Sequence, residues 1–387
     1  MKEEHAMNTL IKGALIHDSI HREPFTSDIL IHDGRITRIA ASIEDAGSFL
    51  IDAHSMHAYS GFIDAHSHIG LAGYGIGYEG MDYNERNDIA TPHLRGIDGF
   101  KPMQPSLENA AKAGVTTVCV GPGSANVLGG TFFAVKTVGR CVDDMVVKDP
   151  IAMKCAFGEN PKRCYRDKCD SSRMTTAAVL REMLYKAKEY DRRIAAAGND
   201  ESKKPSFDMK LEALLPVIRG ELPLKAHAHA TEDIFTAIRI AKEFSLRLTL
   251  EHVTEGHLIV EELVRAGYPC AIGPSLTDAS KWELRNKSFT TPGILARAGI
   301  QVSIITDADV IPQQYLPLCA GLAVKSGMDP FDALQAITIN PAKHAGIQDR
   351  VGSLEEGKDA DIVLTDGSPF EVSTRIYSVF VNGIMVN

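Results

Sequence analysis

The middle of the chain alternates short apolar runs with stretches of helical periodicity, and this alternation limits the fold more than any other feature. The runs are Thr116–Val120, Ile151–Met153, Leu224–His227, Leu248–His252, Pro269–Ile272 and Val302–Ile305. Apolar strands that alternate with helices favour a parallel sheet with helices on its faces. About eight such units fit a (β/α)8 barrel of typical size, ~250 residues. We therefore predict an α/β fold in which residues 61–350 form a TIM barrel.

Both ends of the chain consist of short strand-like segments separated by turns. They are Thr9–Gly13, Asp28–Ile31 and Arg35–Ile39 near the start, and Ala360–Thr365 and Val379–Gly383 near the end. Neither end has enough strands to bury a core alone. We predict that residues 1–60 and 351–387 join in one small composite β-sandwich beside the barrel.

Three helix starts are predicted from capping residues. Ser106, before Leu107, is expected to cap the helix that follows it. Thr231 precedes a helical stretch with apolar residues on one face, and we expect it to cap that helix. Asp329 followed by Pro330 has the form of an N-cap residue with proline at the first helical position.

Charge and composition exclude several classes of partner. The net charge of the 387-residue chain is -9, and no long basic run occurs, which argues against binding nucleic acid or an anionic membrane surface. The sequence shows no apolar stretch long enough to cross a bilayer and no signal-peptide pattern at its start. Seven cysteines in so long a chain do not suggest a disulfide framework. We expect a cytoplasmic protein that acts on a small molecule, and a homo-oligomer is left open.

His66 and His68 end the apolar segment that starts at Phe62. Side chains at positions i and i+2 of a strand point to the same face. Two imidazoles on one face at a strand end can bind a single metal ion.

Three later runs also end on residues of the metal-ligand type. His227, His252 and Asp307 each follow an apolar run directly. The active site of a (β/α)8 barrel lies at the C-terminal ends of its strands, so these side chains are expected to meet there. Imidazole and carboxylate ligands together suit zinc, iron or manganese.

Two longer motifs mark the two ends of the barrel. The opening motif is Gly61-Phe62-Ile63-Asp64-Ala65-His66-Ser67-His68. The closing motif combines Asn340-Pro341-Ala342-Lys343 with the segment from Gly352 to Val363. Both motifs resemble those of the amidohydrolase superfamily, in particular its imidazolonepropionase-like and prolidase-like branch. The resemblance covers nearly the whole chain and implies the same barrel with a small composite β-sandwich.

The resemblance also implies roles for the candidate residues. His66, His68 and His227 would bind a divalent metal, most readily zinc, with one or two ions in the site. His252 would bind a second ion or donate a hydrogen bond to substrate or water. Asp307 would contact the metal and take a proton from the attacking water. The metal in such a site lowers the pKa of bound water toward ~7 and polarises the carbonyl.

Two residues compete for the ligand that bridges two ions. Many members of the superfamily use a carboxylated lysine on the fourth strand, and others use a glutamate. Lys154 lies within the predicted fourth strand, and Glu159 lies just past its end. A glutamate needs no modification and a strand end suits a ligand, so we favour Glu159 and keep Lys154 as the alternative. If neither binds, the site holds one ion.

Further candidates surround these positions. His229 is a candidate for contact with metal or substrate, and Asn126, in a glycine-rich segment, is a weaker one. Lys281, Trp282 and Arg285 follow the seventh run, where a solvated helix face is the simpler interpretation. The long segment 70–105 is expected to cover the site, because long loops on the working face of a barrel are usually functional.

These features together predict a metal-dependent hydrolase that cleaves a carbon–nitrogen bond. An amide, a cyclic amide and a dipeptide are the leading substrate types, with catalysis by Asp307 and His252. The alternative is an amidine deaminase of the same superfamily. A non-catalytic scaffold protein of the superfamily is the third possibility, but such relatives typically lose the ligand residues that this chain retains.

Overall fold

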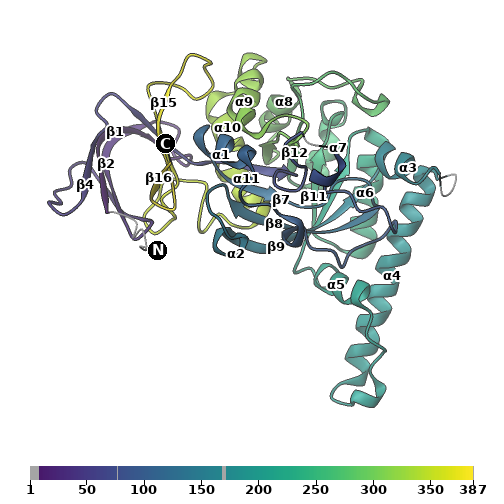
Figure 1. The fold of residues 1–387 in the computed structure, drawn as a ribbon. Coiled ribbons are helices and arrows are strands. Elements are labelled where there is room, and N and C mark those ends of the chain that lie inside the picture. The colour runs from purple at the N-terminus through teal and green to yellow at the C-terminus, as the bar shows by residue number, and fades with distance from the viewer. Residues whose placement is uncertain (1–7, 76, 168–170, 387) are drawn as a thin grey trace.

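The computed structural model describes residues 8–75, 77–167 and 171–386. It contains two sheets, one built from both ends of the chain and one from its middle. In Figure 1 the purple N-terminal strands and the yellow C-terminal strands lie together on one side of the molecule, and the barrel lies on the other. Both chain ends therefore belong to the same small β-structure.

The small sheet has the strand order β16-β15-β14-β5-β1-β2-β3, with β4 paired to β1. Its C-terminal strand β14 pairs antiparallel with β5, so that Ile362 lies opposite Ser60. Fully buried side chains such as Ile11, Ile29 and Phe380 form its core. This sheet supports the predicted composite β-sandwich. Its strands are β1 (Thr9–His17), β2 (Phe25–His32), β3 (Arg35–Ala40), β4 (Phe49–Asp52), β5 (His57–Ser60), β14 (Ile362–Thr365), β15 (Ile376–Val381) and β16 (Ile384–Val386).

The second sheet is the predicted eight-stranded barrel sheet, with its strands paired in chain order. The apolar runs recognised in the sequence correspond to strands of this sheet, and nearly all of their side chains are buried. The strands are β6 (Phe62–Ser67), β7 (Val115–Val120), β8 (Leu128–Lys136), β9 (Val146–Ala156), β10 (Leu224–Ala228), β11 (Leu248–His252), β12 (Cys270–Ile272) and β13 (Val302–Ile304).

Strand β8 departs from the expected uniform parallel arrangement. It pairs antiparallel with both β7 and β9, whereas the other neighbours in the sheet are parallel. The connection from β7 to β8, residues 121–127, contains no helix. A parallel neighbour requires a crossover of a dozen or more residues, so this short connection produces a hairpin instead.

The carboxylate of Asp64 joins the first and last strands of the barrel, which are not paired as strands. Its Oδ2 accepts hydrogen bonds from Thr306 N at 2.9 Å, Thr306 Oγ1 at 2.7 Å and Gln313 Nε2 at 2.7 Å. Its Oδ1 accepts a hydrogen bond from His66 N at 2.9 Å. The same side chain thus brings the end of β6 next to Asp307, which follows β13.

Helices pack around the barrel sheet, and α4 with α5 extends away from the main body in Figure 1. Asp329 caps α10 as predicted, since its side chain accepts from Phe331 N and Asp332 N. The prediction for Ser106 was wrong, because it is the second residue of α1 and Gln104 occupies the N-cap position. The prediction for Thr231 was also wrong: it is the first residue of α6, and its backbone N donates to the Glu255 carboxylate. The helices are α1 (Pro105–Lys112), α2 (Val142–Met145), α3 (Glu159–Cys164), α4 (Arg173–Ala197), α5 (Met209–Ile218), α6 (Thr231–Phe244), α7 (Val260–Ala266), α8 (Thr291–Arg297), α9 (Leu316–Lys325), α10 (Pro330–Ala336) and α11 (Ile339–Ala345). Within the described ranges, none of them combines the length and the apolar character needed to cross a membrane.

Candidate metal centre

Five histidines from three strands meet at the C-terminal end of the barrel sheet. His66 lies in β6 and His68 directly follows it, His227 lies in β10 with His229 just beyond, and His252 ends β11. The ring centroid of His252 lies 5.0 Å from that of His66, 4.3 Å from that of His227 and 4.6 Å from that of His229. All five residues are buried. The sequence separated these residues by up to 186 positions, and the barrel brings them into one cluster.

Each of the five imidazoles is anchored through Nδ1, which leaves its Nε2 on the other side of the ring. An imidazole fixed in this way is oriented with its Nε2 lone pair available to a metal ion. The anchors of Nδ1 are Glu251 Oε2 for His66 (3.0 Å), the Gly121 carbonyl for His68 (2.7 Å), Ser124 Oγ for His227 (2.8 Å), Thr254 Oγ1 for His229 (2.7 Å) and the Gly273 carbonyl for His252 (2.7 Å).

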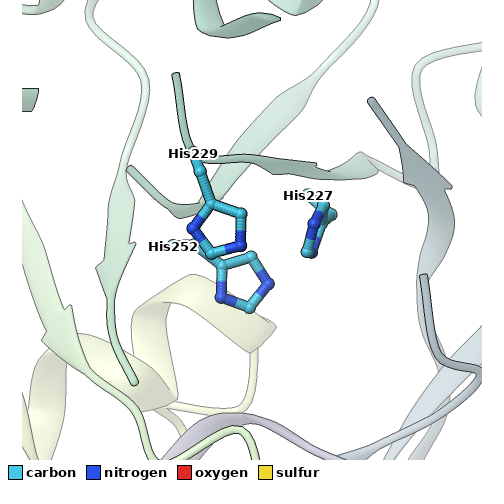
Figure 2. Close-up of side chains that lie close together, drawn as sticks. All are labelled: His227, His229 and His252. Carbon is cyan, nitrogen blue, oxygen red and sulfur yellow. The ribbon is translucent and has the colours of Figure 1, made fainter. Parts of the chain in front are cut away.

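The donor atoms fit a divalent metal ion. His252 Nε2 is buried and has no hydrogen-bond partner within the described part of the chain. Ligand-type atoms of His227, His229 and His252 all lie within 4.8 Å of one another, and those of His66, His252 and Asp307 form a second such group. Figure 2 shows the first group, with the rings of His229 and His252 next to each other and His227 facing them. A buried imidazole nitrogen without a partner is costly unless a ligand satisfies it.

The backbone is unusual at two of the candidate ligands, His252 and Asp307. His252 has φ of 74° and the following Val253 has φ of 42°, while Asp307 has φ of 53°. Residues other than glycine rarely adopt these φ angles, and backbone strain of this kind is found most often at functional sites. At His252 the left-handed turn breaks the strand alternation.

Burial keeps the histidines in the neutral form that binds metals. It lowers the pKa of His66, His227 and His229 well below the ordinary 6.5, and it lowers the pKa of His252 to about 4. For Asp307, burial acts to raise the pKa, but the neighbouring histidines outweigh it and hold the value well below the usual range. Asp307 Oδ1 lies 3.3 Å from His68 Nε2 and 3.9 Å from His66 Nε2. At neutral pH the cluster thus presents imidazole lone pairs and one carboxylate.

Of the two candidates for a bridging ligand, Lys154 lies at the cluster. Its Nζ is 3.0 Å from His66 Nε2, and the side chain is fully buried. Burial lowers its pKa to about 8, with Asp307 and Glu251 opposing the shift. The ammonium group has no hydrogen bond to a carboxylate among the described residues.

Glu159 lies at the first residue of α3, and its carboxylate is engaged elsewhere. Its Oε1 accepts a hydrogen bond from Glu283 N at 2.9 Å, and its own N donates to Glu283 Oε2 at 2.9 Å. It belongs to neither of the two ligand groups found in the described residues. The preceding Gly158 has φ of 82° and leaves no room for a Cβ beside the Glu283 carboxylate.

The cluster opens into a polar cavity of about 270 Å³. Tyr83 and Asn84 of the segment 70–105 line it, and the Tyr83 ring lies 5.4 Å from that of His68, so part of this segment forms the cavity wall. Lys281 also lines the cavity; its Nζ contacts Glu283 Oε1 at 2.7 Å and Asn160 Oδ1 at 3.1 Å.

Three sequence candidates lie away from the cavity. The amide of Asn126 is used within the protein, because it donates to Thr91 Oγ1 and accepts from the Tyr165 hydroxyl. Trp282 is 72% exposed, and Arg285 stacks on its ring at 4.8 Å. These side chains do not reach the histidines.

Sequence reasoning did not identify Glu251, Ser124 and Glu283 as part of the site. Glu251 immediately precedes His252 in β11, and its carboxylate points inward and accepts a hydrogen bond from His66 Nδ1. Glu283 Oε1 lies 4.0 Å from His227 Nε2 and 3.9 Å from His229 Nε2. Only the position of Glu251 in an apolar run gave a signal, since a charged residue there must find a buried partner.

Comparison with known proteins identifies the family. A family model described as Amidohydrolase family matches residues 58–386. A crystal structure of an amidohydrolase from Thermotoga maritima MSB8 is 38% identical, with a TM-score of 0.94, and the match covers 98% of this chain and 99% of that chain. These two findings agree with the barrel and the flanking sheet described above.

Named relatives differ in length and activity. Amidohydrolase tasK of Hapsidospora irregularis is 29% identical over 92% of this chain, which spans only about two fifths (39%) of that relative. An imidazolonepropionase of Thermoplasma volcanium is 41% identical, over 22% of this chain and 24% of its own length. Proteins named dihydroorotase and adenine deaminase match at 25% and 22% identity, and a prolidase structure at 14% identity shares the fold with a TM-score of 0.60. The prediction of an enzyme of the amidohydrolase type, with an imidazolonepropionase among its relatives, is confirmed. The prolidase structure shows a shared fold. The chain belongs to the amidohydrolase family.

Proposed function

We propose that the protein is a metal-dependent hydrolase that cleaves a carbon–nitrogen bond in a small molecule. The observation that carries this proposal is the buried, unpartnered Nε2 of His252 beside four other imidazoles and Asp307. An apolar barrel does not require five oriented histidines. A divalent metal, for which zinc is the leading choice, would satisfy these nitrogens.

The ligands proposed for the metal are His66, His68, His227, His252 and Asp307. His229, whose ligand-type atom lies with those of His227 and His252, is proposed to contact the metal or the substrate. A bound divalent ion supplies a Lewis acid that activates water and polarises a carbonyl. Asp307 then has a second role, because its carboxylate is positioned to take the proton of the attacking water and to deliver it to the leaving nitrogen. The new bond joins water oxygen to the carbonyl carbon, and the carbon–nitrogen bond breaks as the nitrogen receives that proton.

For the bridging ligand we propose Lys154 in place of Glu159, which the sequence favoured. The proximity of Lys154 Nζ to His66 Nε2 and its lowered pKa support this choice. A neutral amine adds to carbon dioxide to give a carbamate and release one proton, and the carbamate carries the two oxygens that a bridge needs. The hydrogen bonds that engage Glu159 with Glu283 argue against a bridging role for Glu159.

The volume and the polar lining of the cavity fit a small polar substrate, and amides, lactams and dipeptides are the leading types. An amidine deaminase is the second candidate, because relatives named adenine deaminase match along nearly the whole chain. Cytoplasmic location and oligomeric state stay predictions, as do the domain boundaries at residues 60 and 351.

A substrate screen tests the proposal. Protein loaded with zinc, manganese or iron is incubated with N-acyl amino acids, dipeptides, lactams and amidines, and release of amine or ammonia is measured. Metal-dependent release of an amine supports the amidohydrolase activity, and release of ammonia from amidines supports the deaminase. If no compound is hydrolysed and the protein binds no metal, both assignments are wrong.

A further inference from the structure

The carboxylate of Glu251 is enclosed in the barrel beside the histidine cluster. Its side chain is fully buried. Its Oε2 accepts hydrogen bonds from His66 Nδ1 at 3.0 Å and Lys225 Nζ at 2.9 Å. Its Oε1 accepts from Thr249 Oγ1 at 2.7 Å and from His344 Nε2 at 2.8 Å. The carboxylate therefore has four donors and no freedom to turn.

The partners of Glu251 come from separate parts of the fold. Lys225 lies on the neighbouring strand β10, Thr249 on β11 itself, and His344 on α11, in the segment that closes the barrel. Lys225 is almost fully buried and balances the charge of Glu251. Because each donor is held by a different element, the position of the carboxylate is set by the whole barrel.

His66 is the only one of the five histidines whose Nδ1 meets a carboxylate. The other four anchors are carbonyl or hydroxyl oxygens. A carboxylate that accepts from Nδ1 fixes the tautomer with the Nε2 lone pair free, and it makes that lone pair a stronger donor to a metal. His66 Nε2 in turn faces Lys154 and Asp307.

Packing alone does not explain this arrangement. Two buried charges lose their hydration, and replacing such a pair with apolar side chains of similar size is often neutral or stabilising. A barrel interior filled by aliphatic side chains would be the simpler solution.

We propose that Glu251 is a positioning residue for the metal centre, which acts through His66, and that Lys225, Thr249 and His344 hold it for that purpose. This inference rests on the proposed metal site. It predicts that removal of the charge on Glu251 weakens metal binding even where the fold is intact.

The experiment measures the dissociation constant for zinc by competition with a chromophoric chelator, and the melting temperature of the metal-free protein. Glu251→Gln removes the charge but leaves Lys225 unpaired, so the double variant Lys225→Met/Glu251→Gln is made in parallel to remove both charges. Thr249→Val is the matched control, because it deletes one hydrogen bond to the same carboxylate and leaves the contact with His66.

The double variant is expected to melt close to the parent and to bind zinc 10–100-fold more weakly, the usual effect of losing such a partner. Thr249→Val is expected to change zinc affinity less than about threefold, since Glu251 keeps its charge and its other three donors. Zinc affinity in a folded double variant within threefold of the parent would overturn the inference while leaving the metal site intact. If the parent itself binds no zinc, the failure lies with the proposed function.

Discussion

Glu159 and Glu283 bind each other reciprocally across the mouth of the barrel. The backbone N of each donates to the carboxylate of the other, and both distances are 2.9 Å. This pair joins the start of α3 to the turn Trp282–Leu284 that follows β12. The glutamate that the sequence offered as a metal bridge thus connects two loops of the site.

Two substitutions separate the candidates for the bridge. Lys154→Met is expected to lower the number of bound metal ions per chain, because it removes the group beside His66. Glu159→Gln is expected to keep the parent's metal content, since the amide oxygen still accepts from Glu283 N. Metal content is measured by mass spectrometry after dialysis. Loss of metal in Glu159→Gln with full content in Lys154→Met would show that the bridge is Glu159.

Asp307→Asn tests the proton-transfer role. The amide retains the shape of the side chain but cannot accept a proton near neutral pH. Turnover is expected to fall by ~10²–10⁴-fold, the range for a lost general acid–base group. Metal content is expected to stay above half of the parent's. An asparagine variant with turnover within twofold of the parent would exclude this role for Asp307.

Asp64→Asn tests the closure of the barrel. Asp64 Oδ2 accepts three hydrogen bonds, and an amide nitrogen in that place would face donors. Hydrogen bonds to a buried charged group contribute ~1.5–3 kcal/mol each, and a loss of about 3 kcal/mol in unfolding free energy is expected. Denaturant unfolding measures it. Asp33→Asn, at an exposed turn, is the control and should match the parent. Equal stability of the two variants would contradict the account of Asp64.

The sequence was sufficient to predict the barrel sheet, the joint small sheet and the gathering of His66, His227, His252 and Asp307. Each rests on a local pattern, an apolar run that ends on a ligand-type residue at the C-terminal end of a strand. The antiparallel course of β8 was not predicted, because residues 128–136 were not among the apolar runs recognised in the sequence.

Contacts between residues on opposite sides of the barrel could not be predicted from local sequence patterns. Lys154 and His66 are 88 residues apart, and only the closure of the sheet brings Nζ to Nε2. Glu251 follows the alternation of β11 and points inward. His252 reaches the site because its φ is positive, and the apolar pattern of the sequence does not predict this backbone angle. The choice between Lys154 and Glu159 therefore depended on the three-dimensional arrangement.

A pH dependence of stability is expected from the small sheet. His17 on β1 is half-buried against His57 and Tyr59, and burial, followed by the neighbouring His57, lowers its pKa from 6.5 to about 4. The folded state therefore binds fewer protons than the unfolded state between these values. Stability is fully present above pH 6.5 and decreases as the pH falls toward 4.

The substitution His17→Phe isolates this effect, because it keeps a ring against Tyr59 and removes the titrating nitrogen. Melting temperatures are compared between pH 7.5 and pH 5 for parent and variant. The melting temperature of the parent is expected to fall further than that of the variant between pH 7.5 and pH 5. An equal loss in both proteins would assign the pH dependence to other groups.

The most direct test of the metal centre is the zinc content of the purified parent and of a His66→Asn/His227→Asn variant after dialysis against zinc-containing and then zinc-free buffer. The account predicts at least one zinc per chain in the parent and less than a tenth of that in the variant, with the melting curve of the zinc-free variant close to that of the zinc-free parent. A parent that retains no zinc, manganese or iron under these conditions, or a folded variant that retains as much metal as the parent, would contradict it.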